Sequence, residues 1–141
     1  MFQNIAAKLN CPNVRQILSH CIFDNSPEGI DAALCKYPGE IFYGWVEDDK
    51  PLGICGFRVF PDKIEICHIA VAEAARGMGI GTAMVYALGE KYAGTIVAET
   101  DDDAVGFYKK CGFEAMLLYR EYNGQKYRRW ACTLTRSYAN V

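Results

Sequence analysis

Three glycines within five residues, inside the segment 76–82, mark the point where a predicted strand passes into a predicted helix. The strand is the apolar alternation over 64–71, and the helical pattern runs on to Tyr92. Glycine has no Cβ, so the backbone can turn tightly here and bring several N–H groups close to a ligand. A helix N-terminus adds partial positive charge and unpaired N–H donors. The segment therefore predicts a phosphate site, and the guanidinium of Arg76 adds a permanent cation.

Two common nucleotide-binding motifs do not fit this loop. A Walker loop needs a lysine directly after its last glycine, but Thr82 follows Gly81. The dinucleotide pattern G-x-G-x-x-G also fails. The position of its third glycine is occupied by Thr82 if the pattern starts at Gly77, and by Met84 if it starts at Gly79. The pattern that fits is R-x-x-G-x-G, which begins at Arg76. The alternative is a glycine-rich turn that only starts a helix.

A second segment, residues 101–113, carries another recognisable pattern. Together with R-x-x-G-x-G it resembles the GCN5-related N-acetyltransferase (GNAT) superfamily, whose second block reads N-x-x-A-x-x-(F/L)-Y-x-x-x-G-F. The residues in register with that block are Ala104, Phe107, Tyr108, Gly112 and Phe113. Asp101 stands where asparagine is usual, and an aspartate caps a helix equally well. The resemblance covers roughly residues 42–113 and implies binding of acetyl-CoA, with no metal.

The order of elements predicts an α/β fold with a mixed sheet. Helices are expected from Pro12 and from Pro27, where Ser26 would be the N-cap and Pro38-Gly39 the end. Further predicted elements are strands at 41–46, 52–60, 63–71 and 95–98, a helix from 102 or 103 to 111, and a final hairpin, 114–122 with 126–135, turning at Asn123-Gly124. The strands before and after the glycine helix should be parallel, since a right-handed crossover joins them.

The resemblance implies the same layout. It is a single-domain, mainly antiparallel sheet with helices on both faces, whose central parallel strand pair splays apart at the cofactor site. The sequence shows no internal repeat and no linker, so one domain is expected over residues 1–141.

Composition limits the class of partner. The chain has 141 residues, 51% of them hydrophobic, and a formal net charge of −2, which fits one globular domain. This charge argues against a nucleic-acid or anionic-membrane surface. Neither a membrane-spanning run nor a secretion signal is evident, and seven cysteines without a C-x-x-C pair predict reduced thiols in the cytoplasm.

The resemblance assigns the cofactor contacts to backbone groups. The main chain of Ile69, Ala70 and Val71 would line the pantetheine, with an N–H near Ile69 facing the acetyl oxygen. Equally, these are three apolar strand residues of the core, and both descriptions can hold together. The pyrophosphate would be bound, beside Arg76, by the N–H groups of Gly77, Met78, Gly79, Ile80 and Gly81 and by the hydroxyl of Thr82.

The resemblance also assigns a general acid. Tyr108 matches the family tyrosine that lies near the sulfur of CoA. A phenol titrates near pH 10, so it is protonated at neutral pH and can donate to a thiolate. A tyrosine that merely packs its helix on the sheet is the alternative.

The general base is less clearly indicated by the sequence. Glu65 lies six residues before Val71, where the histone-acetylating branch places its base, and it ranks first. Glu99 ends the following strand and ranks second. His68, which could accept a proton at pH 7, ranks last because a lone histidine on an apolar face is more often a core residue. A further alternative is that a relay of water molecules deprotonates the amine, with no single essential base in the protein.

These expectations amount to an N-acetyltransferase that moves an acetyl group from acetyl-CoA to a primary amine by direct attack on the thioester. The acceptor is expected to be a small molecule, while a peptide amine, either an N-terminus or a lysine, stays open. The rival function is a non-catalytic acyl-CoA-binding module or sensor of the same fold. Exposed strand edges in the last hairpin would also allow a homodimer.

Overall fold

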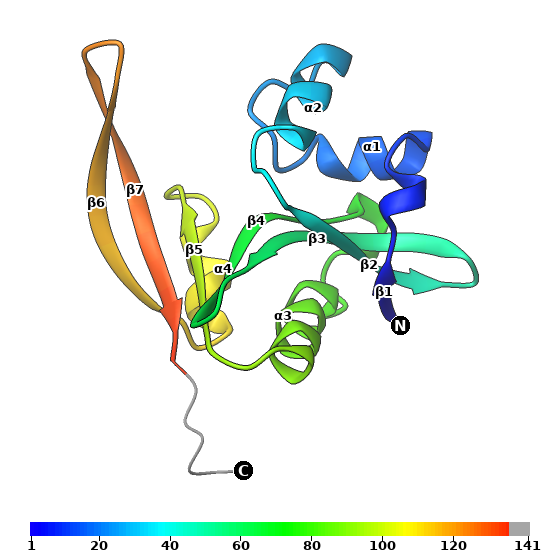
Figure 1. Cartoon of the computed structure of the whole chain (residues 1–141). Coiled ribbons are helices and arrows are strands. Elements are labelled where there is room, and N and C mark those ends of the chain that lie inside the picture. Colours follow the sequence, from blue (N-terminus) through cyan, green and yellow to red (C-terminus); the bar gives the residue numbers. More distant parts are fainter. Residues whose placement is uncertain (136–141) are drawn as a thin grey trace. The chain divides into compact units, whose positions relative to one another are not determined.

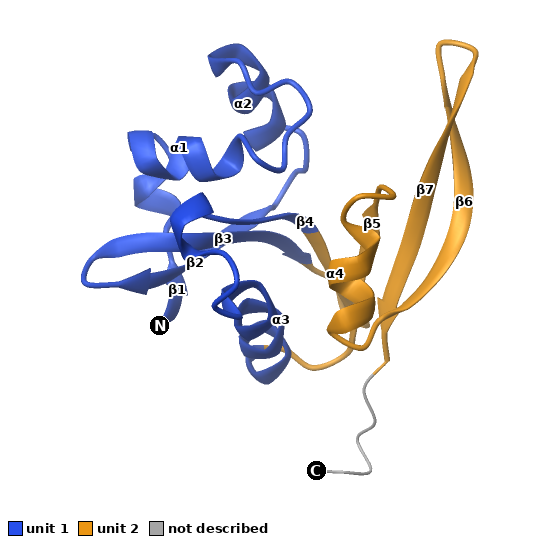
Figure 2. Cartoon of the chain, turned by 180° about the vertical axis from the view of Figure 1, so that it is seen from behind, with its two compact units in different colours: residues 1–58, 67–91 blue, residues 59–66, 92–141 orange. Residues whose placement is uncertain are grey.

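The computed structural model describes residues 1–135, which divide into two compact units (Figure 2). Unit 1 comprises residues 1–58 and 67–91, and unit 2 comprises, of the described residues, 59–66 and 92–135. Together the strands form a seven-stranded sheet with the order β1-β2-β3-β4-β5-β7-β6 (Figure 1). Within the described residues no helix is long and apolar enough to cross a membrane.

Unit 1 contains most of the helices. Its elements are β1 (Phe2–Asn4), the 3-10 turn η1 (Ala6–Lys8), α1 (Pro12–Leu18), α2 (Pro27–Leu34), β2 (Ile41–Glu47), β3 (Lys50–Val59), the second half of β4 (Lys63–Val71), the 3-10 turn η2 (Glu73–Ala75) and α3 (Ile80–Lys91). The predicted hairpin of β2 and β3 is confirmed, with Asp48 and Asp49 both at positive φ in its turn.

The helices of unit 1 cover both faces of its strands (Figure 1). On one face α1 and α2 bury a cluster with β2, β3 and β4, whose members include Leu18, Ile30, Phe42, Ile54 and Ala70. Neighbouring strand residues point to opposite faces, so Gly53 faces away from this cluster. A Cβ on Gly53 would lie 2.9 Å from Cε of Met84 and 3.0 Å from Cγ2 of Ile80, so α3 packs closely there.

Helix α2 begins as predicted and ends earlier. The side chain of Ser26 accepts a hydrogen bond from the N–H of Gly29 at 3.1 Å, which confirms the N-cap. The helix stops at Leu34, so the predicted end at Pro38-Gly39 is wrong. The cause is a tightening of the last turn, where the N–H of Lys36 bonds three residues back to Ala33.

A separate turn follows, in which the N–H of Glu40 donates to the carbonyl of Tyr37 at 3.2 Å. Gly39 has φ of +79° in this turn. Glu40 is therefore fixed immediately before the first residue of β2.

Unit 2 is built around the parallel pair. The first half of β4 pairs in parallel with β5 (Thr95–Thr100) through the register Lys63–Thr95 to Ile66–Ala98, as predicted. Strand β5 pairs antiparallel with β7 (Gln125–Leu134), and β7 pairs antiparallel with β6 (Glu114–Tyr122). The sheet is therefore mixed and mainly antiparallel, which confirms the predicted fold class.

Helix α4 (Val105–Lys110) packs against β6 and β7. It starts two to three residues later than predicted. Oδ1 of Asp101 accepts from the N–H of Ala104 at 2.9 Å, so residues 102–104 form a turn in place of the first helical turn. The predicted left-handed cap is confirmed, because Gly112 has φ of +98° and the N–H of Phe113 bonds to the carbonyl of Tyr108 at 3.0 Å.

Candidate active site

The glycine loop of unit 1 adopts a backbone that side chains disfavour. Gly77 has φ of +80° and Gly79 has φ of +76°. A Cβ added at either position would meet no atom within 4 Å, so these glycines are required by conformation and not by lack of space. The open space beside them lies directly in front of α3, which starts at Ile80.

The N–H groups of this loop bond to no other group within the described residues. Among residues 1–135 no recorded hydrogen bond has the N–H of Gly77, Met78, Gly79, Ile80 or Gly81 as its donor. The first helical bond of α3 runs from the N–H of Ala83 to the carbonyl of Gly79, at 2.9 Å. Residues 76–79 of the loop are exposed, with Met78 68% accessible, whereas Ile80 and Gly81 are buried. Unpaired donors at the positive end of a 12-residue helix suit an anion such as a diphosphate.

Arg76 ties this loop to the end of β4. Its Nε donates to the carbonyl of Val71 at 3.4 Å, and its side chain is exposed. The N–H of Ala72 donates to the carbonyl of Leu52 at 2.8 Å, which anchors the link to β3. The predicted phosphate residues 76–82 and the predicted pantetheine residues 69–71 therefore lie together in unit 1. Ala70 is buried in the core cluster, whereas Ile69 and Val71 are half-buried on the alternate positions of β4.

Tyr108, the predicted general acid, lies in α4 of unit 2. Its side chain is buried at 4% exposure. The ring makes edge contacts with Phe107 and Phe113, each at 5.2 Å between centroids. Aromatic contacts on two sides fix the orientation of the ring.

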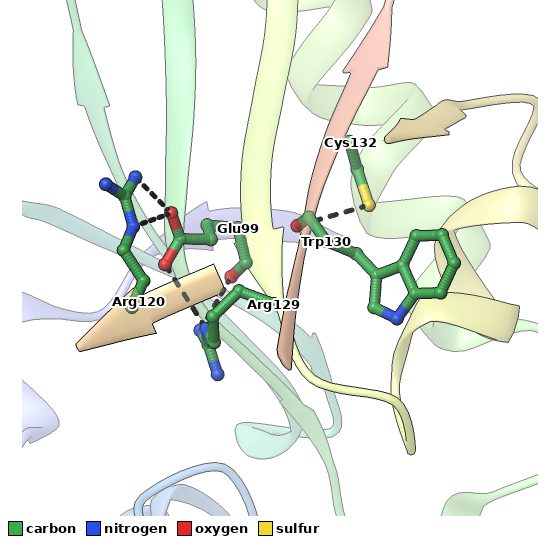
Figure 3. A network of polar contacts seen from close by, with 5 residues as sticks. All are labelled: Glu99, Arg120, Arg129, Trp130 and Cys132. Atoms are coloured by element: carbon green, nitrogen blue, oxygen red, sulfur yellow. Dashed lines mark hydrogen bonds and ion pairs between the residues drawn. The ribbon is translucent and has the colours of Figure 1, made fainter. Parts of the chain in front are cut away.

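Glu99, the second-ranked base, is held by two arginines of the last hairpin (Figure 3). Its Oε1 accepts from Nη2 of Arg120 at 2.7 Å, and its Oε2 accepts from Nε of Arg129 at 3.2 Å. Partial burial would raise the pKa of Glu99, but the hydrogen bonds and charges of both arginines outweigh it and hold the pKa below its usual value. A carboxylate engaged in this way is a weak proton acceptor, so its catalytic role stays a prediction without geometric support.

Because its pKa is lowered in the folded state, Glu99 should make unfolding depend on pH. Its stabilising effect is fully present above the unfolded pKa, about 4.3, and is lost as pH falls through the lower folded value. Glu99→Gln should therefore lower the free energy of unfolding at pH 7 and flatten its decline between roughly pH 5 and 3. Urea denaturation across this range measures both effects. Asp31→Asn, which alters an exposed carboxylate paired with Arg15, is the control. If the free energy of unfolding of Glu99→Gln depended on pH as in wild type, the lowered pKa of Glu99 in the folded protein would be contradicted.

Glu65, the first-ranked base, lies on β4 in unit 2. It is half-buried and stands opposite Val97 in the parallel register. Its role stays a prediction. The described residues contain no cluster of three or more metal-binding side chains.

The structure also brings together two residues that the sequence left apart. Nδ1 of His68 lies 2.6 Å from Oε2 of Glu40, and the two side chains are only 7% and 1% exposed. The His68 ring stacks on Phe42 at 6.1 Å and meets the edge of Tyr37 at 5.7 Å. Sequence reasoning ranked His68 last and missed Glu40, because 28 residues separate the partners and no local pattern connects them.

Comparison with known proteins points to one family. The sequence model of the Acetyltransferase (GNAT) family matches residues 11–113. No curated protein matches the chain in sequence.

Several solved structures share the fold of this chain. A GNAT-family protein from Desulfovibrio desulfuricans superposes with a TM-score of 0.74 at 21% identity, covering 96% of this chain and 98% of that one. A GNAT family acetyltransferase from Elizabethkingia anophelis with acetyl-CoA bound has a TM-score of 0.69 at 20% identity, covering 96% and 97%. An aminoglycoside 6'-N-acetyltransferase complexed with coenzyme A has a TM-score of 0.69 at 19% identity, covering 96% and 96%.

Proposed function

The chain belongs to the GNAT acetyltransferase family, and on this premise we propose that it transfers the acetyl group of acetyl-CoA to a primary amine of a small molecule. The observation that carries the proposal is that, within residues 1–135, the N–H groups of Gly77–Gly81 donate to no other group, and that Arg76 joins their loop to the end of β4. Two of the similar structures hold acetyl-CoA or coenzyme A, which supports an acyl-CoA co-substrate.

The residues of this chain have distinct tasks in the proposed reaction. Bound acetyl-CoA supplies an activated thioester. The loop N–H groups and Arg76 hold its diphosphate, and the N–H of Ile69 donates to the acetyl oxygen as negative charge develops there. Tyr108 gives its phenolic proton to the departing thiolate. The amine attacks the thioester directly, with no acyl-enzyme.

The acceptor class is proposed from one structural neighbour. This chain shares its fold with an aminoglycoside 6'-N-acetyltransferase. The acceptor in that protein's name, an aminoglycoside, is a small molecule with amino groups. Peptide amines are the second candidate class.

A homodimer stays part of the proposal. β6 is an edge strand of the sheet, and Met116, Tyr119 and Tyr122 on it are 73%, 58% and 65% exposed. Exposed edges of this kind pair readily with another strand. We also propose a reducing compartment, since all seven cysteines are free thiols.

A ligand panel followed by an acceptor panel tests the function. Acetyl-CoA, ATP and NAD are compared by thermal unfolding, where a ligand at a hundred times its Kd should stabilise the protein by about 2.7 kcal/mol. We expect this effect from acetyl-CoA alone. Spermidine, tyramine, an aminoglycoside and an alanine-initiated peptide are then incubated with acetyl-CoA and analysed by mass spectrometry for acetylated product. Binding without transfer to any amine would favour the acyl-CoA-binding module, and stabilisation by ATP or NAD alone would contradict the family role.

A further inference from the structure

The carboxylate of Glu40 is buried with only one of its two oxygens hydrogen-bonded. Among residues 1–135, its Oε1 is the one fully buried side-chain polar atom of a non-exposed residue without a hydrogen-bond partner. Folded proteins pair nearly all such atoms, and the exceptions often mark functional sites or bound water. His68 is the hydrogen-bonding partner of this carboxylate within the described residues, so a proton on Nδ1 of the ring would be donated to Oε2.

The pair is held in one arrangement by its neighbours. A Cβ at Gly56 would overlap with Oε2 of Glu40, so the carboxylate packs directly on the backbone of β3. Phe42 and Tyr37 fix the plane of the imidazole. When Nδ1 donates its proton to the carboxylate, Nε2 carries the lone pair. Within the described part of the chain Nε2 makes no recorded hydrogen bond.

The pair lies beside the backbone that the acetyl group is proposed to contact. His68 directly precedes Ile69 on β4, within unit 1.

We propose that His68 is the proton acceptor of the acetyl transfer and that Glu40 positions its ring and stabilises the imidazolium. This role rests on the proposed function. Nε2 takes one proton from the acceptor ammonium, and the neutral amine attacks the thioester carbon. The C–N bond forms and the C–S bond breaks. As the amide forms, the nitrogen loses its second proton to water, Tyr108 protonates the thiolate and regains a proton from water, and the imidazolium releases its proton to water.

The surrounding groups are compatible with this assignment. Burial raises the pKa of the Cys21 thiol to about 12, with a further contribution from Glu40, although backbone hydrogen bonds oppose the shift. Burial likewise raises the pKa of Cys55, whose neighbours are Cys67, Glu40 and Cys21. Both thiols therefore stay protonated and neither is a nucleophile at neutral pH. Two cations, Lys36 and Arg58, lie over the ring of Tyr37, which contacts His68.

Kinetics of matched histidine variants test the role. The chain has two histidines, and His20 is exposed. With spermidine or whichever panel amine wild type acetylates, His68→Gln should lower kcat/KM for the amine by about 10²- to 10⁴-fold. The Kd for acetyl-CoA should stay within roughly twofold, and the acidic limb of the pH profile should disappear. His20→Gln should match wild type in all three measurements.

Imidazole NMR supplies a readout that does not depend on turnover or on the folding of a variant. A long-range ¹H–¹⁵N correlation spectrum contains only two rings, with His20 as the internal reference. We expect the neutral ring of His68 to carry its proton on Nδ1. Glu40→Gln should remove this preference and lower kcat/KM in parallel, if the variant folds.

The outcomes separate this inference from the proposed function. If wild type binds acetyl-CoA but acetylates no amine, the proposed function fails, while the tautomer of His68 is still measured. If wild type is active and His68→Gln keeps its activity and its acidic limb, the inference is overturned. A neutral His68 protonated on Nε2 would overturn it as well, because that nitrogen could not accept a proton.

Discussion

Gly79→Asp should weaken acetyl-CoA binding by roughly 100-fold or more, with little loss of folded structure. The backbone at Gly79 has φ of +76°, which aspartate tolerates better than most residues, and a Cβ there meets no atom within 4 Å. The new carboxylate would project into the space proposed for the diphosphate. Two unit charges about 4 Å apart repel by about 4 kcal/mol at an effective dielectric of 20.

Gly124→Asp is the matched control for this prediction. Gly124 has φ of +79° in the turn of the last hairpin, and a Cβ there also meets no atom within 4 Å. Both variants therefore add the same charge at a similar backbone conformation. Titration of the melting temperature with acetyl-CoA at fixed salt compares them, and only Gly79→Asp should lose the ligand effect. Equal affinity in both variants would show that the glycine loop does not hold the diphosphate.

Tyr108→Phe should lower kcat by about 10²- to 10⁴-fold while leaving the Kd for acetyl-CoA nearly unchanged. The substitution removes only the phenolic oxygen, so the ring keeps its edge contacts with Phe107 and Phe113. Without the phenol the thiolate must leave unprotonated or take its proton from water. The loss should therefore appear in the chemical step and not in binding.

Tyr119→Phe makes the same chemical change on β6, where Tyr119 is 58% exposed, and should behave as wild type. Initial rates over a range of pH separate the two variants. A Tyr108→Phe enzyme with kcat within twofold of wild type would rule out the general-acid role, and another residue or water would have to supply the proton.

Local chemistry explains which elements could be predicted. Strand β4 was predicted with its observed bounds because its alternation is continuous from Lys63 to Val71. The hairpin of β6 and β7 turns at Asn123-Gly124 as expected, since both residues accept positive φ. The predicted ends of helices were wrong where tertiary contacts or short-range hydrogen bonds decide where the helix begins or ends. Helix α4 starts late because the Asp101 side chain bonds to Ala104, and α2 ends early in a tightened turn.

The sequence by itself determined the glycine loop and the parallel crossover around it. These features depend on backbone freedom and on periodic burial, and both are properties of contiguous residues. Only the tertiary structure decided how the charges are paired. It joined Glu99 to arginines 21 and 30 residues away, and Glu40 to His68 across 28 residues. An ion pair depends on distance in space and on removal from water, and neither can be read from neighbouring letters in a chain.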